Sequence, residues 1–392
     1  MHPSDRSRIP SEAERLQGKK ILSIYFRHKP GGLCKRLYMM FDALVSAGAE
    51  VHYIAVEPYP ISSHIRIVPH LLWTPFKKKE GLLFWLYFVS IAPFYLFVVG
   101  RRENIDLVSV FGGIYGFFAV FLKVLLQKPI MIFVRADAYE IGQILGRPSF
   151  LLFFEEIMSR ISFKLSDKIV TVNHHLKKMI STRYRVREDK IEVLFNHIQD
   201  LSEEGQIKSK YRKKLKLEGN SFIIITVAIL DSRKNIDFLI RVASHLKEPA
   251  LFLIVGDGSE KNTLKKIAAA VKGNAKIIFT GWQEDVSDFL KASDLFVLPS
   301  KHEGCSNALL EALSYGIPCL GSNIPENREV LRFDQLMFDP IDIQTFSDKL
   351  GRVILDQDFS KQVRAFSNQA AKQLIFDWDR SIADLHYRLL FL

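Results

Sequence analysis

Residues 294–322 have the sequence DLFVLPSKHEGCSNALLEALSYGIPCLGS, and their pattern indicates the fold of the second half of the chain. An apolar run of strand length at 294–300 is followed by a polar loop, a helix-length apolar segment and a second short strand at 317–322. Ser306 is a suitable helix N-cap and Gly316 a suitable C-cap, so we expect a helix over residues 307–315. A strand, loop, helix and strand in this order form one unit of a parallel sheet covered by helices.

The same alternation extends along the whole chain. In the first half, apolar strands are expected at 21–26, 50–56, 105–112, 129–137 and 166–173, and in the second half at 221–230, 251–258 and 276–282. We therefore predict an α/β protein with two doubly wound, Rossmann-like domains that face a cleft. In open parallel sheets ligands bind at the carboxyl ends of the strands, so the chemistry is expected at that edge.

Local composition gives the expected domain boundaries. Residues 1–20 are polar and lack the apolar segment of a signal peptide, so they are expected to form a flexible tail. The N-terminal domain is predicted over 21–195 and the C-terminal domain over 221–375, with the polar stretch 196–220 as the linker.

Composition narrows the partners. The 392 residues include 48% hydrophobic and 25% charged residues, and the formal net charge is +11, which favours an anionic partner. No RNA-recognition or helix-turn-helix signature accompanies the basic residues, so an anionic membrane surface or a phosphorylated small molecule is favoured over nucleic acid. Three cysteines without a CxxC pair fit a reducing cytosol.

Two carboxylates flank the predicted start of the helix at 307–315. Backbone N–H groups around Cys305, Ser306 and Asn307, together with the positive end of the helix, suit a phosphate. Glu303 and Glu311 are then left to accept hydrogen bonds from hydroxyl groups on either side, a layout that a nucleotide-sugar offers. In the alternative interpretation, Glu311 only compensates the helix dipole and Glu303 is a solvated loop residue.

The whole stretch resembles the donor-site signature of the GT-B-fold retaining glycosyltransferases of family 4. The strand followed by Pro-Ser, the E-G-x-x-N sequence, the second glutamate at its spacing and the G-x-P-x-L-G-S end carry the resemblance. The stretch VAILDSRKNIDFLIRVA at 227–243 also resembles this family, and Lys234 matches its lysine that binds the donor diphosphate. The family's arginine position holds Ile229, so Arg233 is the candidate that would supply the guanidinium.

The resemblance implies further site residues. Gly256 matches a glycine-rich strand end, Trp282 and Gln283 would contact the nucleobase, and Asp137 would contact the acceptor hydroxyl. For Trp282 a place in the core is the alternative. The remaining residues expected near the donor are Gly31 and Gly32 after the first strand, and Gly304, Cys305, Ser306, Asn307 and Glu311 around the helix start.

The sequence contains no pattern that we interpret as a metal site. The DQD at 356–358 and the DWD at 377–379 do not follow apolar strands, so we interpret them as surface acids. The resemblance implies a UDP- or GDP-linked sugar as a substrate and no cofactor. It also implies that residues 376–392 form a terminal helix that crosses back to the N-terminal domain.

Residues 81–100 are uncharged, apolar and long enough to span a membrane. A span would place the strands before and after it on opposite sides of the membrane, although both belong to one predicted sheet. We therefore expect an interfacial helix, with a buried core segment as the alternative. Its rings and the flanking cations, Lys77–Lys79 and Arg101–Arg102, are expected to meet anionic lipid; the rings are those of Phe84, Trp85, Tyr87, Phe88, Phe94, Tyr95 and Phe97.

These features together predict a metal-independent hexosyltransferase-type glycosyltransferase. It would transfer a sugar with retention to a lipid-linked or membrane-surface glycan, at the cytoplasmic face of the membrane. Two alternatives remain: a nucleotide-sugar epimerase of the same fold, and a non-catalytic glycosyltransferase-like partner subunit.

Overall fold

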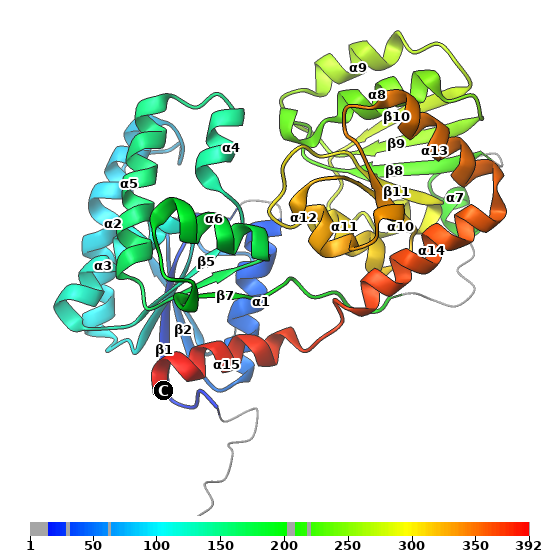
Figure 1. The fold of residues 1–392 in the computed structure, drawn as a ribbon. Helices are drawn as coiled ribbons and strands as arrows, with labels where there is room; N and C mark the ends of the chain where they lie inside the picture. The colour runs from blue at the N-terminus through cyan, green and yellow to red at the C-terminus, as the bar shows by residue number, and fades with distance from the viewer. Residues whose placement is uncertain (1–14, 29–31, 62–63, 202–207, 218–220, 392) are drawn as a thin grey trace, which may run out of the picture. The chain divides into compact units, whose positions relative to one another are not determined.

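The computed structural model describes residues 15–28, 32–61, 64–201, 208–217 and 221–391 (Figure 1). They form two compact units. Unit 1 contains the described residues up to Tyr139, then Pro148–Leu194 and the end of the chain from Asp377, whereas unit 2 contains Glu140–Arg147 and Phe195–Phe376.

Unit 1 is built on a seven-stranded sheet with the order β3-β2-β1-β4-β5-β6-β7. All the pairings are parallel. The central strands are mostly apolar because both faces of a parallel sheet are covered, and every residue of β4 is buried. The strands are β1 (Lys20–Ile24), β2 (Glu50–Ala55), β3 (Ile67–Leu71), β4 (Leu107–Phe111), β5 (Ile130–Val134), β6 (Lys168–Thr171) and β7 (Ile191–Val193).

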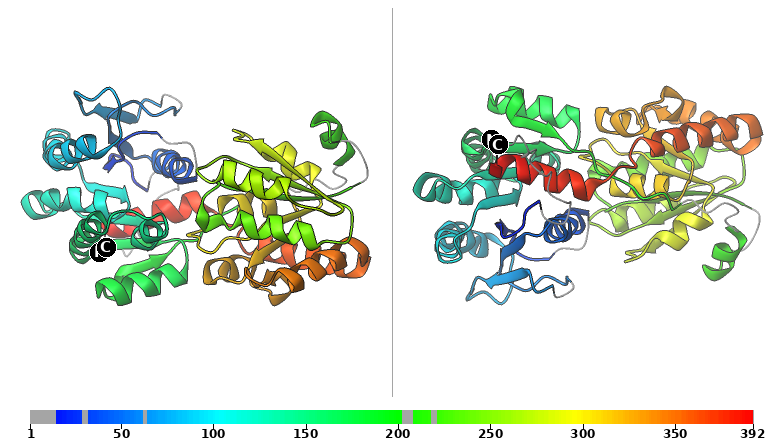
Figure 2. Two further views of the ribbon diagram at one scale, coloured as in Figure 1. Left: turned by 90° about the horizontal axis from the view of Figure 1, so that it is seen from above. Right: turned by 90° about the horizontal axis from the view of Figure 1, so that it is seen from below.

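The helices of unit 1 lie in two layers. The chain moves from β1 to β3 in one direction and from β4 to β7 in the other, so right-handed connections place α1 on one face of the sheet and α2, α3, α5 and α6 on the opposite face. Helix α3 contacts both α2 and α5, and the terminal helix α15 packs on α1 (Figures 1 and 2). The helices are α1 (Gly32–Ser46), α2 (Leu82–Arg102), α3 (Gly113–Leu126), α5 (Ser149–Leu165), α6 (His174–Tyr184) and α15 (Trp378–Phe391). Helix α4 (Ala138–Ile144) begins in unit 1 and continues in unit 2.

Unit 2 has a six-stranded parallel sheet with the order β10-β9-β8-β11-β12-β13. Its strands are β8 (Phe222–Val227), β9 (Ala250–Val255), β10 (Ala275–Gly281), β11 (Leu295–Leu298), β12 (Cys319–Ser322) and β13 (Met337–Phe338). Its helices are α7 (Lys208–Lys214), α8 (Ile236–His245), α9 (Lys261–Ala269), α10 (Ser287–Ala292), α11 (Asn307–Ser314), α12 (Pro325–Leu331), α13 (Ile343–Leu355) and α14 (Gln357–Lys372). The prediction of two parallel α/β sheets is confirmed.

The stretch predicted as a linker contains a helix that belongs to unit 2. Helix α7 packs on α10. The Arg212 guanidinium donates to the carbonyl of Ala292 at 2.9 Å and pairs with Asp294 at 2.5 Å. The two units therefore divide at residues 194 and 195, and the described part of 196–220 lies within unit 2.

The apolar segment predicted at 81–100 forms α2, which has one buried and one exposed face. Phe84, Phe88 and Leu96 are buried, so the expectation that all seven rings form a surface is wrong for Phe84 and Phe88. In the part of the chain that the structure describes, α2 is the one helix long and apolar enough to cross a membrane, with 33% of its apolar window buried. Strands β1 and β4 pair in one sheet, with Ile21 opposite Leu107, so a span by α2 would have to separate them.

Candidate active site

Two loops meet at the carboxyl edge of the unit 2 sheet. The loop after β8 runs through the 3-10 helix η3 (Ser232–Lys234), and the loop after β11 leads to α11. The backbone N–H of Lys301 donates to the carbonyl of Arg233 at 2.7 Å. The amide of Asn235 donates to the carbonyls of Pro299 and Pro340, each at 3.1 Å. Asn235 has φ 53°, a left-handed conformation that asparagine tolerates better than most residues, so this side chain can join the loops.

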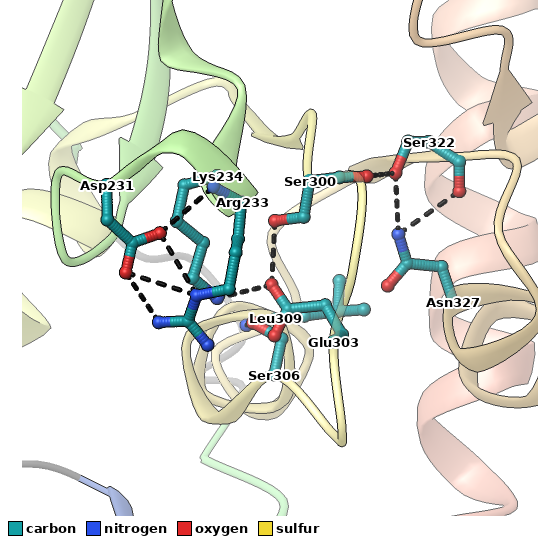
Figure 3. A network of polar contacts seen from close by, with 9 residues as sticks. All are labelled: Asp231, Arg233, Lys234, Ser300, Glu303, Ser306, Leu309, Ser322 and Asn327. Carbon is teal, nitrogen blue, oxygen red and sulfur yellow. Dashed lines mark hydrogen bonds and ion pairs between the residues drawn. The ribbon is translucent and has the colours of Figure 1, made fainter. Parts of the chain in front are cut away.

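The centre of this edge is an ion pair between Lys234 and Glu303. Lys234 Nζ donates to Glu303 Oε1 at 2.5 Å, and the two side chains are only 15% and 6% exposed (Figure 3). The two residues are 69 positions apart in the sequence. The structure thus brings together the two residues that the sequence predicted as the catalytic lysine and the sugar-binding carboxylate.

A row of buried polar groups supports Glu303 (Figure 3). Ser300 Oγ donates to Glu303 Oε1 at 2.7 Å, and Ser322 Oγ donates to the Ser300 carbonyl at 2.5 Å. The amide of Asn327 in α12 donates to Ser322 Oγ at 3.0 Å. These contacts join the ends of β11 and β12 to α12, so the position of the Glu303 carboxylate is fixed by three elements of the sheet edge. Sequence reasoning did not identify Ser300, Ser322 or Asn327 as site residues, although Ser300 and Ser322 each stand at a strand end.

Arg233 lies beside Lys234 but is held by Asp231. Its Nε is 3.2 Å from each oxygen of the Asp231 carboxylate, and one terminal nitrogen is 2.5 Å from Oδ2. Asp231 also accepts from the Arg233 backbone N–H, so the pair forms a closed local turn. In this conformation, the guanidinium is committed to Asp231, and Ile229 at the family's arginine position is exposed.

The start of α11 has the predicted cap. Ser306 Oγ accepts from the backbone N–H of Leu309 at 3.3 Å, and the helix begins at Asn307. Glu311 lies in the second turn of this helix, and Gly304 and Cys305 lie in the loop before the cap. The helix ends at Ser314, and Gly316 has the positive φ of 67° that favours glycine there.

Gly256 lies where β9 ends and touches the loop after β8. Its φ is 136°, and a Cβ atom there would overlap the carbonyl of Ala228. A side chain at this position would push the β8 loop, and with it Lys234, away from the sheet. The glycine is therefore required by the close packing of two backbones, and the structure places it on the same edge as Lys234 and Glu303.

Trp282 and Gln283 follow β10 at the outer strand of the sheet. The Trp282 side chain is 50% exposed, which excludes the alternative of a core tryptophan. The Gln283 amide donates to the carbonyl of Thr280 at 3.2 Å. In unit 1, Gly32 is the first residue of α1, and Gly31 lies outside the described residues.

Asp137 belongs to the sheet edge of unit 1, after β5. Its carboxylate accepts from the backbone N–H of Tyr139 and from Arg183 Nη1, both at 3.0 Å. The Arg183 guanidinium also lies 3.9 Å from the centre of the Tyr139 ring. Because Asp137 lies in unit 1 and the predicted donor residues that follow β8 lie in unit 2, the structure does not bring them together within one unit.

Glu326, in the first turn of α12, is a titratable group close to Glu303 that sequence reasoning missed. Burial raises the pKa of its carboxyl to about 7, and the negative charges of Glu140 and Glu303 act in the same direction. No short motif marks this residue in the sequence. Its altered pKa comes mainly from burial in the folded unit.

Among the described residues, no group of three or more histidine, cysteine, aspartate or glutamate side chains is arranged to hold a metal ion. Lys234 supplies an ammonium group at the carboxyl edge. Anion binding by an ammonium group next to a helix start requires no metal in principle.

The edge therefore has the composition of an anion-binding and hydroxyl-binding site, and comparison with known proteins identifies its class. The model of glycosyl transferases group 1 matches residues 207–373, and the model of glycosyltransferase family 4 matches residues 30–200. The two models of this glycosyltransferase class together match most of the chain, one in each half, and the two parallel sheets agree with the GT-B fold.

Two relatives have names that refer to a lipid-linked acceptor or to lipopolysaccharide. The chain is 33% identical over 208 residues to a UDP-Gal:alpha-D-GlcNAc-diphosphoundecaprenol alpha-1,3-galactosyltransferase of Escherichia coli, an alignment of 50% of this chain and 53% of that protein. It is 25% identical over 232 residues to the lipopolysaccharide core biosynthesis glycosyltransferase LpsE of Rhizobium meliloti, covering 58% of this chain and 65% of that protein. The chain thus spans between about half and two thirds of the length of these relatives.

The fold is also that of a solved enzyme structure. Sucrose-phosphate synthase from Thermosynechococcus elongatus superposes with a TM-score of 0.78 at 15% identity, covering 95% of this chain and 99% of that chain. At this identity the likeness establishes the fold.

Proposed function

We propose that this protein is a glycosyltransferase that transfers a sugar from a nucleotide diphosphate to a lipid-linked or membrane-surface glycan. The observation that carries the proposal is the ion pair of Lys234 and Glu303 at the carboxyl edge of the unit 2 sheet. This edge is where open parallel sheets bind ligands, and family membership supports the reaction class. Retention at the anomeric carbon is part of the proposal and is based on the family.

The pair suggests how the donor would be held. A diphosphate next to Lys234 would compete with Glu303 for the ammonium group, and the carboxylate would then accept from hydroxyls of the donor sugar. Ser300 keeps Glu303 in place during this exchange. When the bond from the anomeric carbon to the diphosphate oxygen breaks, Lys234 would stabilise the charge on the leaving group, while the acceptor oxygen forms the new bond and its proton is released.

The ammonium charge supplies the electrostatic role that a divalent cation fills in other glycosyltransferases, so we propose a reaction without a metal or cofactor. The donor would be a UDP- or GDP-linked sugar. Trp282, half exposed at the end of β10, would stack on the base, and Glu311 would accept from the ribose. Asp137 would contact the acceptor in unit 1.

The exposed apolar side of α2 and the names of the relatives support the acceptor and the location that we propose. Both curated relatives described above are named for glycans carried on lipid, one of them for a diphosphoundecaprenol acceptor. We therefore propose that the protein works at the cytoplasmic face of a membrane, to which it is peripherally bound.

The test is calorimetry with UDP-, GDP- and ADP-sugars, followed by a product assay with membrane lipids as acceptor in the presence of EDTA. We expect one base to bind well and a glycolipid product to form despite the chelator. Loss of product with EDTA, restored by added Mg²⁺, would contradict the metal-independent proposal.

Two alternatives have distinct outcomes in the same assay. Conversion of the donor sugar without any acceptor would identify a nucleotide-sugar epimerase. The absence of binding to every donor would identify a non-catalytic partner subunit, an alternative that Ile229 and the engagement of Arg233 by Asp231 favour.

A further inference from the structure

Helix α5 has an apolar stripe on its exposed side. Phe150, Phe154, Ile157, Ile161 and Leu165 follow one another at intervals of three or four residues, the spacing of one helix face, and all five are exposed. Phe154 is 55% exposed. The opposite side of α5 already packs on unit 1, so the outer stripe is additional to what the core requires.

Helices α3 and α2 repeat this arrangement. On α3 the exposed residues are Phe121, Val124 and Leu125. On α2 they include Leu83, Leu86, Ile91, Phe94 and Val98, at intervals of three to five residues. A soluble helix normally has charged or polar residues on its outer face, whereas a helix that is apolar all round is buried in protein or in lipid.

The three stripes are parts of one surface because the helices are packed closely. A Cβ atom at Gly113 of α3 would lie 2.8 Å from Ser159 Cβ of α5, and one at Gly116 would lie 3.1 Å from Ser162 Cβ. Small residues on both helices therefore allow close approach. Figure 1 shows α2, α3 and α5 as neighbouring helices of unit 1. We call the exposed apolar residues of α2, α3 and α5 the apolar face.

Charges on these helices are mostly basic. Helix α2 carries Arg101 and Arg102 and no acid, and α3 carries Lys123 and no acid. The two acids of α5 are Glu155 and Glu156, and Glu156 is paired with Arg183 of α6 at 3.4 Å and with Arg160 of α5 at 3.5 Å. Exposed cations on or just before these helices include Lys77, Lys78, Arg101 and Lys164.

We infer that the apolar face of α2, α3 and α5 is a docking surface for an anionic lipid bilayer, formed by three helices and not by the 81–100 segment alone. The inference rests on the proposed function, since it specifies how unit 1 would reach a lipid-borne acceptor. Rings and aliphatic chains enter the headgroup region, and the cations meet anionic headgroups.

The occupant is a bilayer surface and not a span or a second copy. A span by α2 would remove Phe84, Phe88 and Leu96 from the core and would place the paired strands β1 and β4 on opposite sides. A second copy would meet the same excess of cations on its own apolar face, and like charges in contact are unfavourable, whereas anionic headgroups are complementary to them.

The experiment is flotation of the full chain with vesicles of pure phosphatidylcholine and with vesicles containing phosphatidylglycerol. We expect the wild type to float more strongly with phosphatidylglycerol. The variant Leu86→Gln/Phe121→Gln/Phe154→Gln, with one change on each helix, should bind at least tenfold more weakly, because each large side chain withdrawn from water changes partitioning by about tenfold. Lys77→Gln/Lys78→Gln/Arg101→Gln/Lys164→Gln should lose the preference for phosphatidylglycerol.

Matched controls come from unit 2. Ile341, Leu355 and Ile375 are exposed apolar residues outside the apolar face, and changing all three to glutamine should leave flotation unchanged. If the first triple variant does not fold, as judged by circular dichroism, Phe94→Gln/Val124→Gln/Ile161→Gln tests the same three helices.

Five results would overturn the inference. Four of them are a wild type that does not float, equal flotation of the triple variant and the wild type, equal binding to both kinds of vesicle, and resistance to alkaline carbonate, which indicates a span. A fifth is sedimentation without vesicles in which the wild type is a dimer and the triple variant a monomer, since a second copy would then cover the face.

Donor calorimetry on the same samples separates this inference from the proposed function. The triple variant should bind donor as the wild type does, because Lys234 and Glu303 lie in unit 2. A wild type that binds donor but does not float would remove only the docking surface. One that floats but binds no donor would remove only the proposed function.

Discussion

The two units have the same architecture but place their unusual residues differently. Both are parallel sheets with buried strands, and in both the helices turn an apolar side to the sheet. In unit 2 the outer side is polar, as on α13, where Gln344, Asp348 and Arg352 face outward. In unit 1 the outer sides of α2, α3 and α5 are apolar as well. Packing on the sheet therefore determines the polarity of only the inner side of a helix, and the polarity of the outer side depends on what surrounds the protein.

The carboxyl edge of the unit 2 sheet shows the opposite kind of unusual placement. There, polar groups are buried: Lys234 and Glu303 are largely enclosed, and Ser300, Ser322 and Asn327 are fully buried behind them. Unit 1 exposes apolar surface that water disfavours, and unit 2 encloses charges that water favours. Each is an unfavourable placement for a free protein, so each points to a ligand.

The largest effect is expected for Phe88→Ala compared with Leu86→Ala. Phe88 is 0% exposed and packs against Phe118, whereas Leu86 is 58% exposed on the other side of α2. Loss of a buried phenyl ring costs about 3–5 kcal/mol, and loss of an exposed leucine costs under about 1 kcal/mol. Chemical denaturation in the absence of lipid measures both. Equal losses would mean that α2 has no distinct inner and outer side.

This pair also shows where sequence prediction ended. The strands, the Ser306 cap and the closeness of Lys234 to Glu303 could be predicted, the first two from local apolar runs and a local side-chain hydrogen bond and the last from family resemblance. The two sides of α2 could not, because a helix with apolar residues all round has no polar contrast that marks which side faces the core.

Other parts of the site depend on the assembled sheet. The contacts of Ser322 with Ser300 and Asn327 exist only because β11 and β12 are neighbours, and the raised pKa of Glu326 comes mainly from burial. Arg233 was predicted as a phosphate ligand, yet a local carboxylate two residues earlier, Asp231, holds it. The sequence shows that Asp231 is close enough to pair with Arg233, but it does not show which of several possible partners the guanidinium takes.

The second prediction tests whether the buried charges of unit 2 serve turnover. We expect Lys234→Ala to lower turnover by at least tenfold and up to several hundredfold, since a charge-assisted contact to a leaving phosphate contributes about 1.5–3 kcal/mol or more. Arg233→Ala should have a smaller effect because Asp231 already engages that guanidinium. Initial rates at saturating donor measure both.

A matched variant keeps this result interpretable. Lys234→Ala leaves the Glu303 carboxylate buried without its cation, so some loss of stability is also expected. Lys234→Ala/Glu303→Gln removes that charge and should recover stability but not turnover. Turnover within a factor of two of the wild type in Lys234→Ala would remove this residue from the site.

The third prediction separates the two carboxylates. Glu303→Gln should lower turnover about tenfold or more, because a neutral amide oxygen accepts more weakly than a carboxylate from the hydroxyls of the donor sugar. Glu311→Gln should weaken donor binding by about five- to tenfold, because a hydrogen bond to a charged group contributes about 1–1.5 kcal/mol more than a neutral one, and leave the melting temperature unchanged. Calorimetry and thermal melting distinguish the two variants, and normal donor binding and turnover in both would show that neither carboxylate contacts the donor.

The smallest effect concerns Glu326, whose carboxyl links the stability of the α12 region to pH. Its pKa in the folded protein is raised to about 7 by burial first and by the neighbouring carboxylates second, from 4.5. The folded state therefore binds more protons than the unfolded state between these values, so this residue makes stability fall as the pH rises from about 4.5 to about 7.

Glu326→Gln removes the ionisation while keeping the size of the side chain. At pH 8 we expect the variant to be more stable than the wild type by about 1–2 kcal/mol, after a discount for solvent screening, and therefore to melt at a higher temperature. At pH 5 the difference in melting temperature should disappear. Thermal melts of both proteins from pH 5 to pH 8 measure the effect, with Glu284→Gln, an exposed glutamate elsewhere in unit 2, as the control for a general change of charge. A gap that is the same at every pH would mean that Glu326 is ionised throughout, and the enclosed edge of unit 2 would then hold one more charge than this structure indicates.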